Sequence, residues 1–175
     1  TWYWNRYPGA QCDIEAYVYM PLLDELDYVP TERYAHAPEL LEHSRNIAKH
    51  YDLYKDTVFQ TEVSEINWDE SSKRWIIHTN RGDAMKAKYI AMANGPLTRP
   101  KLPGIRGVEK FKGHTFHTSR WDYNYTGGSP EGGMTKLAGK RVGIIGTGAT
   151  AIQCIPHLGE DAKSLCVFQR TPTSV

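Results

Sequence analysis

The sequence has no long apolar run and almost no net charge. Its 175 residues are 40% hydrophobic, and no stretch approaches the roughly 18 consecutive apolar residues of a membrane-spanning helix. We therefore expect no membrane span. The 21 Lys and Arg residues oppose 20 Asp and Glu residues, which leaves a formal charge of +1. This balance argues against a nucleic-acid partner, because nucleic-acid binders depend on excess positive charge.

Cysteine is scarce as well. The chain has three cysteines, Cys12, Cys154 and Cys166, and no two of them form a Cys-x-x-Cys pair. An odd and scattered set argues against a disulfide scaffold and against a dithiol redox motif, and it is typical of a reducing compartment. We therefore expect a cytoplasmic protein.

Metal-ligand and hydrolase patterns are also missing. His36, His43 and His50 recur every seven residues. This spacing separates neighbours by about 10.5 Å along a helix axis, which is too far for two ligands of one metal ion. We interpret these histidines as a solvated stripe and predict no metal site. No serine stands in a Gly-x-Ser-x-Gly setting, so a serine hydrolase is not supported.

The first half of the chain changes its hydrophobic period. Residues 38–51 have helical spacing, with apolar residues recurring on one face. Residues 57–68 then alternate between apolar and polar types, and 74–79 and 84–93 form two further strand-like runs that turn residues separate. Short strands joined by turns predict an antiparallel β-meander.

The end of the chain has a different order. Residues 141–145 and 165–169 have the composition of buried strands, and they enclose a predicted helix from Gly148 to about Leu158. This strand–helix–strand order predicts a parallel sheet and an α/β fold class. Pro156 lies inside the helix, and we expect it to end or kink the helix.

A glycine turn joins the first of these strands to the helix. It reads Gly-x-Gly-x-x-Ala at Gly146, Gly148 and Ala151. The first glycine allows a tight turn, the second lets the backbone approach a pyrophosphate, and the alanine lets the helix pack close to the sheet. The pyrophosphate then lies on the free N–H groups at the helix N-terminus. The flanking elements favour dinucleotide binding over an ordinary tight turn.

The end of the second strand indicates which dinucleotide is bound. An NAD site usually has Asp or Glu there to bond the ribose 2′-hydroxyl, whereas residues 167–171 read Val-Phe-Gln-Arg-Thr without a carboxylate. Arg170 can bind a 2′-phosphate with charge-assisted hydrogen bonds. The sequence therefore predicts NADP, unless Arg170 is simply a solvated charge.

A second motif stands about 25 residues before the glycine turn. Residues 111–122 read Phe-x-Gly-x-x-x-His-x-x-x-Trp-Asp. This pattern resembles the fingerprint of type I Baeyer–Villiger monooxygenases, within the flavin-containing monooxygenase superfamily. Residues 1–13 resemble the segment that follows the family's first glycine motif, and residues 93–95, Ala-Asn-Gly, resemble its Ala-Thr-Gly motif at the exit of the flavin domain. The resemblance covers essentially all 175 residues.

The resemblance implies a fold and a domain order. The fold is a two-dinucleotide-binding-domain (Rossmann-like) flavoprotein architecture with the antiparallel β-meander as an insertion, and the chain is an internal fragment of it. Residues 1–100 would be the C-terminal part of the FAD-binding domain including the meander, 101–137 a linker with the fingerprint, and 138–175 the start of the NADP-binding domain. The family's first glycine motif and active-site arginine would lie in missing flanking parts of the same polypeptide.

The resemblance also implies roles for individual residues. Trp2, Asp13 and Tyr19 match positions that line FAD, and Val63 matches a position whose backbone touches the adenine end. His117 resembles the residue that couples the two nucleotide domains, and Asp13 would raise the basicity of the active-site arginine. The further matches are Gln11, Cys12 and Asp13 near the nicotinamide, Thr147, Gly148, Ala149, Thr150, Ala151, Ile152 and Gln153 at the NADP pyrophosphate, and Arg170 and Thr171 at the 2′-phosphate.

The implied activity is a Baeyer–Villiger oxidation that depends on NADPH and FAD. An oxygen atom from O2 is inserted next to the carbonyl of a small-molecule ketone, giving an ester or a lactone, and the protein orients the flavin and excludes water. An N- or S-oxygenating flavin monooxygenase and a truncated, non-catalytic NADP-binding protein stay open as alternatives. Arg120-Trp121-Asp122 favours the Baeyer–Villiger branch. A flavin disulfide reductase is disfavoured because no Cys-x-x-Cys pair exists.

Overall fold

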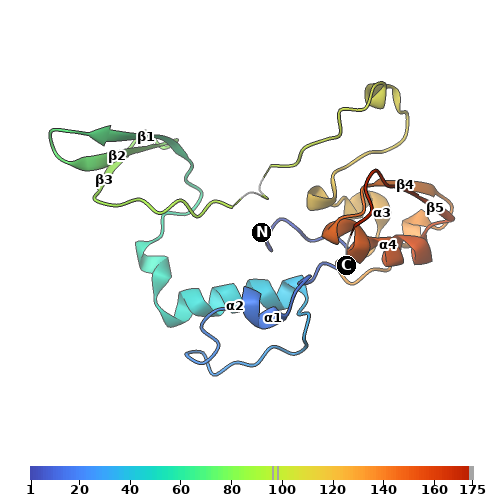
Figure 1. Cartoon of the computed structure of the whole chain (residues 1–175), viewed down its shortest axis with the longest axis horizontal. Coiled ribbons are helices and arrows are strands. Elements are labelled where there is room, and N and C mark those ends of the chain that lie inside the picture. Colours follow the sequence, from blue (N-terminus) through green and yellow to red (C-terminus); the bar gives the residue numbers. More distant parts are fainter. Residues whose placement is uncertain (96, 98, 174–175) are drawn as a thin grey trace. The chain divides into compact units, whose positions relative to one another are not determined.

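The computed structural model describes residues 1–95, 97 and 99–173, and it divides the chain into two units (Figure 1). The first unit is Thr1–Ile47 with Pro96–Val175, and the second unit is Ala48–Gly95. The helices are α1 (Ala16–Tyr19), α2 (Ala37–His50), α3 (Tyr123–Thr126) and α4 (Ala149–Asp161), the strands are β1 (Val63–Asp69), β2 (Arg74–Thr79), β3 (Ala84–Ala87), β4 (Arg141–Ile145) and β5 (Ser164–Phe168), and 3₁₀ turns cover Leu53–Asp56, Val108–Lys110, Thr118–Arg120 and Thr135–Leu137. None of the helices in the described ranges is long and apolar enough to cross a membrane.

The chain ends the first unit with a strand, a helix and a second strand, as the sequence predicts. β4 and β5 pair in parallel, and α4 connects them (Figure 1). Pro156 does not end the helix, because α4 continues to Asp161. The kink, which was the other expected outcome, stays a prediction. Cys154 and Leu158 on either side of the proline are buried, and burial of a leucine side chain contributes about 1.5–3 kcal/mol. This packing offsets the cost of about 3 kcal/mol for a proline inside a helix.

Two hydrophobic clusters fill the first unit. They pack the opening segment, residues 1–13, directly on the strand–helix–strand unit and on α2, so this segment is held although it lacks regular structure. The first cluster is Tyr7, Ala10, Ala37, Met134, Leu137, Ile144, Ala151, Cys154 and Leu158, and the second is Cys12, Ala16, Met20, Ala35 and Leu40.

The buried face of α2 includes a histidine that the sequence analysis interpreted as solvated. His43 is buried beside Leu40, and its Nε2 lies 2.7 Å from the carbonyl oxygen of Pro21. The interpretation of His43 as part of a solvated stripe is therefore wrong. Residues three apart on a helix share a face, so the face that buries Leu40 also buries His43.

The second unit contains an antiparallel sheet in the order β1–β2–β3. Trp68 of β1 lies opposite Trp75 of β2, with ring centroids 5.3 Å apart. The third strand ends at Ala87 and does not reach residue 93 as predicted. The apolar residues beyond it, Tyr89 and Met92, are exposed and pair with no strand in the described part of the chain, so their composition alone does not form a strand.

Candidate functional site

A pocket of about 450 Å³ in the first unit brings distant segments of the chain together. Its walls come from the opening segment with Tyr19 at the end of α1, from residues 97 and 99–101, from residues 117–119, and from the first turns of α4. Residues predicted for FAD, for NADP and for coupling of the two therefore line one cavity. The predicted site residues in its walls are Trp2, Gln11, Asp13, Tyr19, His117, Ala149, Thr150 and Gln153.

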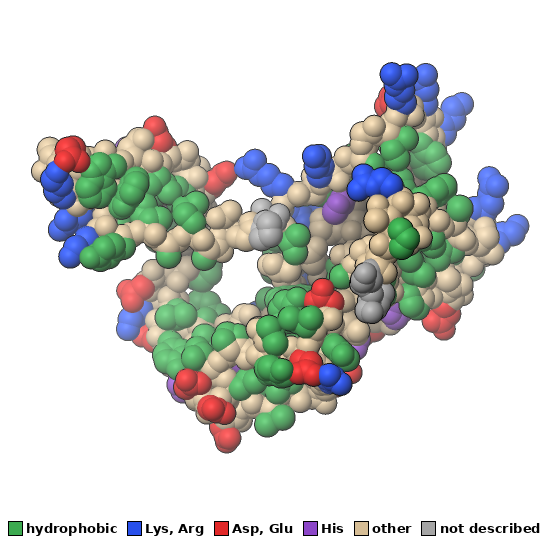
Figure 2. All heavy atoms as spheres, viewed as in Figure 1, with side chains coloured by type: hydrophobic (Ala, Val, Ile, Leu, Met, Phe, Trp, Pro, Cys, Tyr) green, Lys and Arg blue, Asp and Glu red, His purple; other side chains and the backbone are tan. Residues whose placement is uncertain are grey.

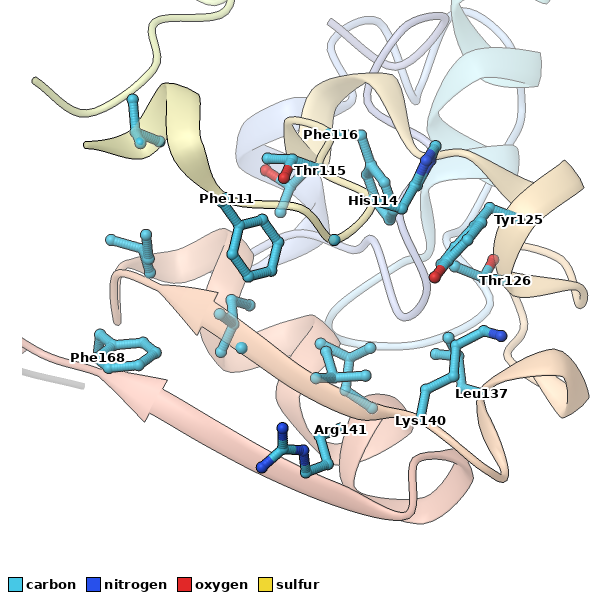
Figure 3. A pocket seen from close by; sticks show the side chains of 18 of the residues that line it. Phe111, His114, Thr115, Phe116, Tyr125, Thr126, Leu137, Lys140, Arg141 and Phe168 are labelled. Carbon is cyan, nitrogen blue, oxygen red and sulfur yellow. The ribbon is translucent and has the colours of Figure 1, made fainter. Parts of the chain in front are cut away.

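A larger and mainly apolar pocket of about 730 Å³ lies between residues 105–126 and the face of the β4–β5 pair. Figure 3 shows Phe111 over this strand pair and the His114 ring beside the Tyr125 ring, whose centroids are 4.0 Å apart. None of the predicted site residues lines it. The smaller pocket is the better candidate site, because it combines charged, polar and aromatic groups with a helix N-terminus.

The glycine turn leaves the N-terminus of α4 open. Gly146 has a φ of +110° and donates its N–H to the carbonyl of Phe168 at 2.9 Å. Gly148 is the N-cap residue of α4, and no side chain caps the helix there. A Cβ added at Gly146 or at Gly148 would meet nothing within 4 Å. Uncapped N–H groups and the positive end of the helix dipole are suited to an anion.

Thr147 connects this turn to the segment after β5. Its hydroxyl accepts a hydrogen bond from Gln169 Nε2 at 3.0 Å and lies 3.2 Å from the hydroxyl of Thr173. Its carbonyl accepts a hydrogen bond from the same Thr173 hydroxyl. Arg170 and Thr171 lie in this connected segment, and Arg170 is exposed. The turn and the predicted 2′-phosphate residues are thus held in one cluster of loops.

Three residues predicted to line FAD form a contact cluster. The Tyr19 hydroxyl donates to Asp13 Oδ1 at 2.6 Å, and the Trp2 ring packs edge-on against the Tyr19 ring at 5.7 Å. The hydrogen bond to Asp13, together with burial, raises the pKa of Tyr19 to about 12. Asp13 therefore has a fixed neighbour at the edge of the pocket.

Removing the carboxylate should change the titration of Tyr19. In Asp13→Ala, we expect the pKa of Tyr19 to fall from about 12 towards its usual 10.0. Because the pKa is raised in the folded chain, the hydrogen bond contributes to stability below pH 10.0 and this contribution is lost as pH rises towards about 12. Phenolate absorbance followed against pH measures the shift, and Tyr19→Phe assigns the signal. Identical titrations of Asp13→Ala and the parent chain would contradict this assignment.

His117 is held by its own segment. It precedes the 3₁₀ turn Thr118–Arg120, and the Ser119 N–H donates to His117 Nδ1 at 3.2 Å. Since Nδ1 accepts this bond, the neutral imidazole carries its proton on Nε2. The ring thus has a defined donor atom and lines the pocket.

The fingerprint segment is also ordered internally. Asp122 caps α3 by accepting from the Tyr125 N–H at 3.1 Å, and its other oxygen lies 2.8 Å from His114 Nε2. Trp121 donates its indole N–H to the Thr126 hydroxyl at 3.2 Å. The Trp-Asp end of the fingerprint therefore stabilises α3, the short helix that follows it.

Several predicted site residues lie outside the pocket walls. Cys12 and Ala151 are buried in the hydrophobic clusters, and burial raises the pKa of the Cys12 thiol. Ile152 is partly exposed on α4. Val63 begins β1 in the second unit. Their contacts with a cofactor stay predictions. Among the residues that the structure describes, no group of three or more His, Cys, Asp or Glu side chains could hold a metal ion.

The pocket also contains residues that sequence reasoning did not single out. Tyr7 is buried in the opening segment and donates to Gln153 Oε1 at 2.8 Å. Arg99 and Lys101 flank Pro100 in the chain, and Thr118 and Ser119 follow His117. The sequence offered two signals for these residues. Two cations flank a proline, and two hydroxyl residues follow the fingerprint histidine.

Comparison with known proteins gives concordant matches. The family model described as flavin-binding monooxygenase-like matches residues 12–175. Neopentalenolactone D synthase of Streptomyces avermitilis is 60% identical over all 175 residues, which make up 30% of its length. A Baeyer–Villiger monooxygenase of Streptomyces coelicolor is 59% identical over the same residues, which make up 29% of its length.

Solved structures agree. The polycyclic ketone monooxygenase of Thermothelomyces thermophila matches with a TM-score of 0.88 and 49% identity, over 98% of this chain and 29% of that protein. The crystal structure of OTEMO in complex with FAD and NADP matches with a TM-score of 0.83 and 38% identity, over 98% of this chain and 32% of that protein. The chain spans about 30% of the length of these curated relatives.

Proposed function

Because the chain belongs to the flavin-binding monooxygenase-like family, we propose that it is part of an NADPH- and FAD-dependent Baeyer–Villiger monooxygenase. The complete protein inserts an oxygen atom from O2 next to the carbonyl of a small-molecule ketone and releases an ester or a lactone. Two relatives support this choice by name, a Baeyer–Villiger monooxygenase and a polycyclic ketone monooxygenase.

The observation that carries the proposal is the open turn at the N-terminus of α4. Open space above Gly146 and Gly148 fits a pyrophosphate, because a Cβ there would occupy the place of the ligand. The first turn of α4 has no acidic residue, so no side-chain charge opposes an anion there. The Ala149 and Thr150 N–H groups would bind the phosphate oxygens, and Arg170 with Thr171 would bind the 2′-phosphate.

The opposite wall of the pocket consists of the residues that we propose to line FAD. Trp2 and Tyr19 supply aromatic surface, and the Asp13 carboxylate supplies a negative charge that increases the basicity of an arginine in the flanking polypeptide. His117 lines the same pocket and would donate to a bound nucleotide from Nε2. When bound, NADPH supplies a hydride and FAD supplies the oxygen-activating group, while these side chains orient the two and exclude water.

The domain order expected from the sequence belongs to the same proposal. Residues 1–100 are the last part of the FAD domain with the β-meander as an insertion, 101–137 are the linker, and 138–175 begin the NADP domain. Parallel sheets are normally covered on both faces, whereas β4 and β5 form a two-stranded sheet among the described residues, with Ile145 and Phe168 exposed. Hydrophobic side chains also gather on the visible surface (Figure 2). Both features support flanking parts that cover this chain.

The cellular setting is part of the proposal too. Cys12, Cys154 and Cys166 are all free thiols, which is compatible with a reducing cytoplasm. The partners are a ketone and O2, with no role for nucleic acid.

Isotope incorporation tests the proposed reaction. The complete, FAD-loaded protein is incubated with NADPH, a polycyclic ketone and O2 labelled with a heavy oxygen isotope, and the products are analysed by mass spectrometry. We expect an ester or lactone that contains one labelled oxygen atom. An N- or S-oxide formed from added amines and sulfides, with no ester from the ketone, would show the sibling class of monooxygenase instead.

A further inference from the structure

We infer that Gln153 is a positioning residue whose side-chain amide locks the opening segment onto α4 and so sets the width of the pocket. The sequence assigned Gln153 to the NADP pyrophosphate through a family resemblance, but its polar atoms are engaged within the protein. Its Oε1 accepts hydrogen bonds from the Tyr7 hydroxyl at 2.8 Å and from the Gln11 N–H at 3.3 Å. Its Nε2 donates to the Gln11 carbonyl at 3.1 Å.

The two bonds to Gln11 use both polar groups of one backbone residue. The amide of Gln153 thereby pairs with Gln11 as a neighbouring strand would, although the two residues are 142 positions apart. Tyr7 adds a third bond from a nearly inaccessible position, with 6% of its surface exposed. Burial raises the pKa of the Tyr7 hydroxyl, so the hydroxyl stays protonated and remains a donor.

Packing next to these bonds keeps the segment close to α4. Gly9 has a φ of +75°, and a Cβ there would lie 2.6 Å from the Gln153 carbonyl oxygen and 2.7 Å from His157 Nε2. The absence of a side chain at this position therefore allows the close approach. The Gly9 N–H also donates to the Pro130 carbonyl at 2.8 Å.

The other side of the segment is fixed independently. The Cys12 N–H donates to the Ala35 carbonyl at 3.0 Å, and the Ala37 N–H donates to the Ala10 carbonyl at 2.8 Å. Residues 10–12 therefore lie between α4 on one side and residues 35–37 on the other. Gln153 supplies the hydrogen bonds on the α4 side.

The position of this lock gives it a role in the reaction, and this step rests on the proposed function. Asp13 follows the locked residues on the flavin wall, and Ala149 and Thr150 lie one helical turn before Gln153 on the NADP wall. The separation of the two walls fixes the distance between the bound nucleotides. A displacement of about 1 Å between reacting groups can cost about 100-fold in rate, so loosening the lock should slow hydride transfer more than it weakens NADPH binding.

Amide exchange tests the lock without any cofactor. In Gln153→Leu, which has a similar size but no hydrogen-bonding groups, we expect the Gln11 amide proton to exchange with solvent at least about tenfold faster, as an open amide would. The neighbouring Cys12 amide, bonded to Ala35, is the internal control and should keep its rate. An unchanged Gln11 rate would overturn the lock, whatever the protein catalyses.

Rapid reduction of the flavin tests the consequence. The complete FAD-loaded protein is mixed with NADPH without oxygen, and the limiting rate and the Kd are measured. For Gln153→Leu we expect a limiting rate lower by about tenfold or more, with a Kd within about threefold of the parent. Gln153→Glu retains acceptors for Tyr7 and for the Gln11 N–H and should recover part of the rate. Tyr7→Phe, which removes one of three bonds, should lower it less.

Controls separate the possible failures. Glu160→Gln changes an exposed residue at the far end of α4 and should alter neither quantity. A Kd raised about tenfold with an unchanged limiting rate would make Gln153 a direct ligand of NADP and overturn the positioning role. If the parent protein is not reduced by NADPH at all, the proposed function fails, while the exchange experiment still decides the lock.

Discussion

Replacing Gly148 with Val is expected to weaken dinucleotide binding strongly while the chain stays folded. The backbone of Gly148 is extended, with a φ of −74°, and its Cβ position is open, so the protein itself tolerates a side chain there. A pyrophosphate does not, because valine methyl groups would keep its oxygens away from the α4 N–H groups. Loss of two charge-assisted hydrogen bonds costs about 3 kcal/mol, which weakens binding about 100-fold.

The comparison requires binding and stability to be measured on the same variants. Titration with NADPH gives the Kd, and urea unfolding gives the free energy of unfolding, which we expect to change by about 1 kcal/mol or less. Gly159→Ala is the matched control, because Gly159 lies in the same helix and a Cβ there also meets nothing within 4 Å. It should bind NADPH as the parent does. Retained binding by Gly148→Val would remove the turn from the site.

Replacing Arg170 with Ala is expected to remove most of the preference for NADPH over NADH. No carboxylate stands at the end of β5 to repel a 2′-phosphate, and the exposed guanidinium follows the strand by two residues. Losing its charge-assisted hydrogen bonds costs about 2–3 kcal/mol, so the Kd for NADPH should rise by about 30-fold or more. NADH lacks the 2′-phosphate, and its Kd should stay within about twofold.

The effect of losing any positive charge must be separated from the loss of a direct contact between Arg170 and the 2′-phosphate. Lys163→Ala removes the same charge just before the opposite end of β5, also from an exposed position, and should change both Kd values only slightly. Titrations of each variant with NADPH and NADH provide the comparison. Equal weakening of both cofactors by Arg170→Ala would show that the residue does not recognise the 2′-phosphate.

The local parts of the site could be predicted because their signals are local. The order β4–α4–β5 follows from hydrophobic runs within about 30 residues, and Gly146 needs its positive φ for the turn itself. The resemblance to the family motifs also indicated that the opening segment belongs to the predicted site. Periodicity likewise found the helix now seen as α2.

The features that the sequence could not provide depend on contacts between distant residues. The amide of Gln153 meets Gln11 through tertiary packing, and no pattern near either residue indicates it. The pairing of Asp13 with Tyr19 is closer in sequence, but it depends on α1, a helix of four residues that ends at Tyr19. The same applies to Pro156. The cost of a proline inside a helix can be read from the sequence, but the tertiary packing that offsets this cost cannot.

Amide resonances can test, residue by residue, whether the uncapped turn of α4 is the NADP site. NADP is added to the isotope-labelled protein, and chemical-shift changes are followed residue by residue. We expect the largest changes at the amides of Ala149 and Thr150 and in residues 169–171. Unmoved α4 amides, with changes confined to the apolar pocket beside Phe111 and Leu137, would contradict it.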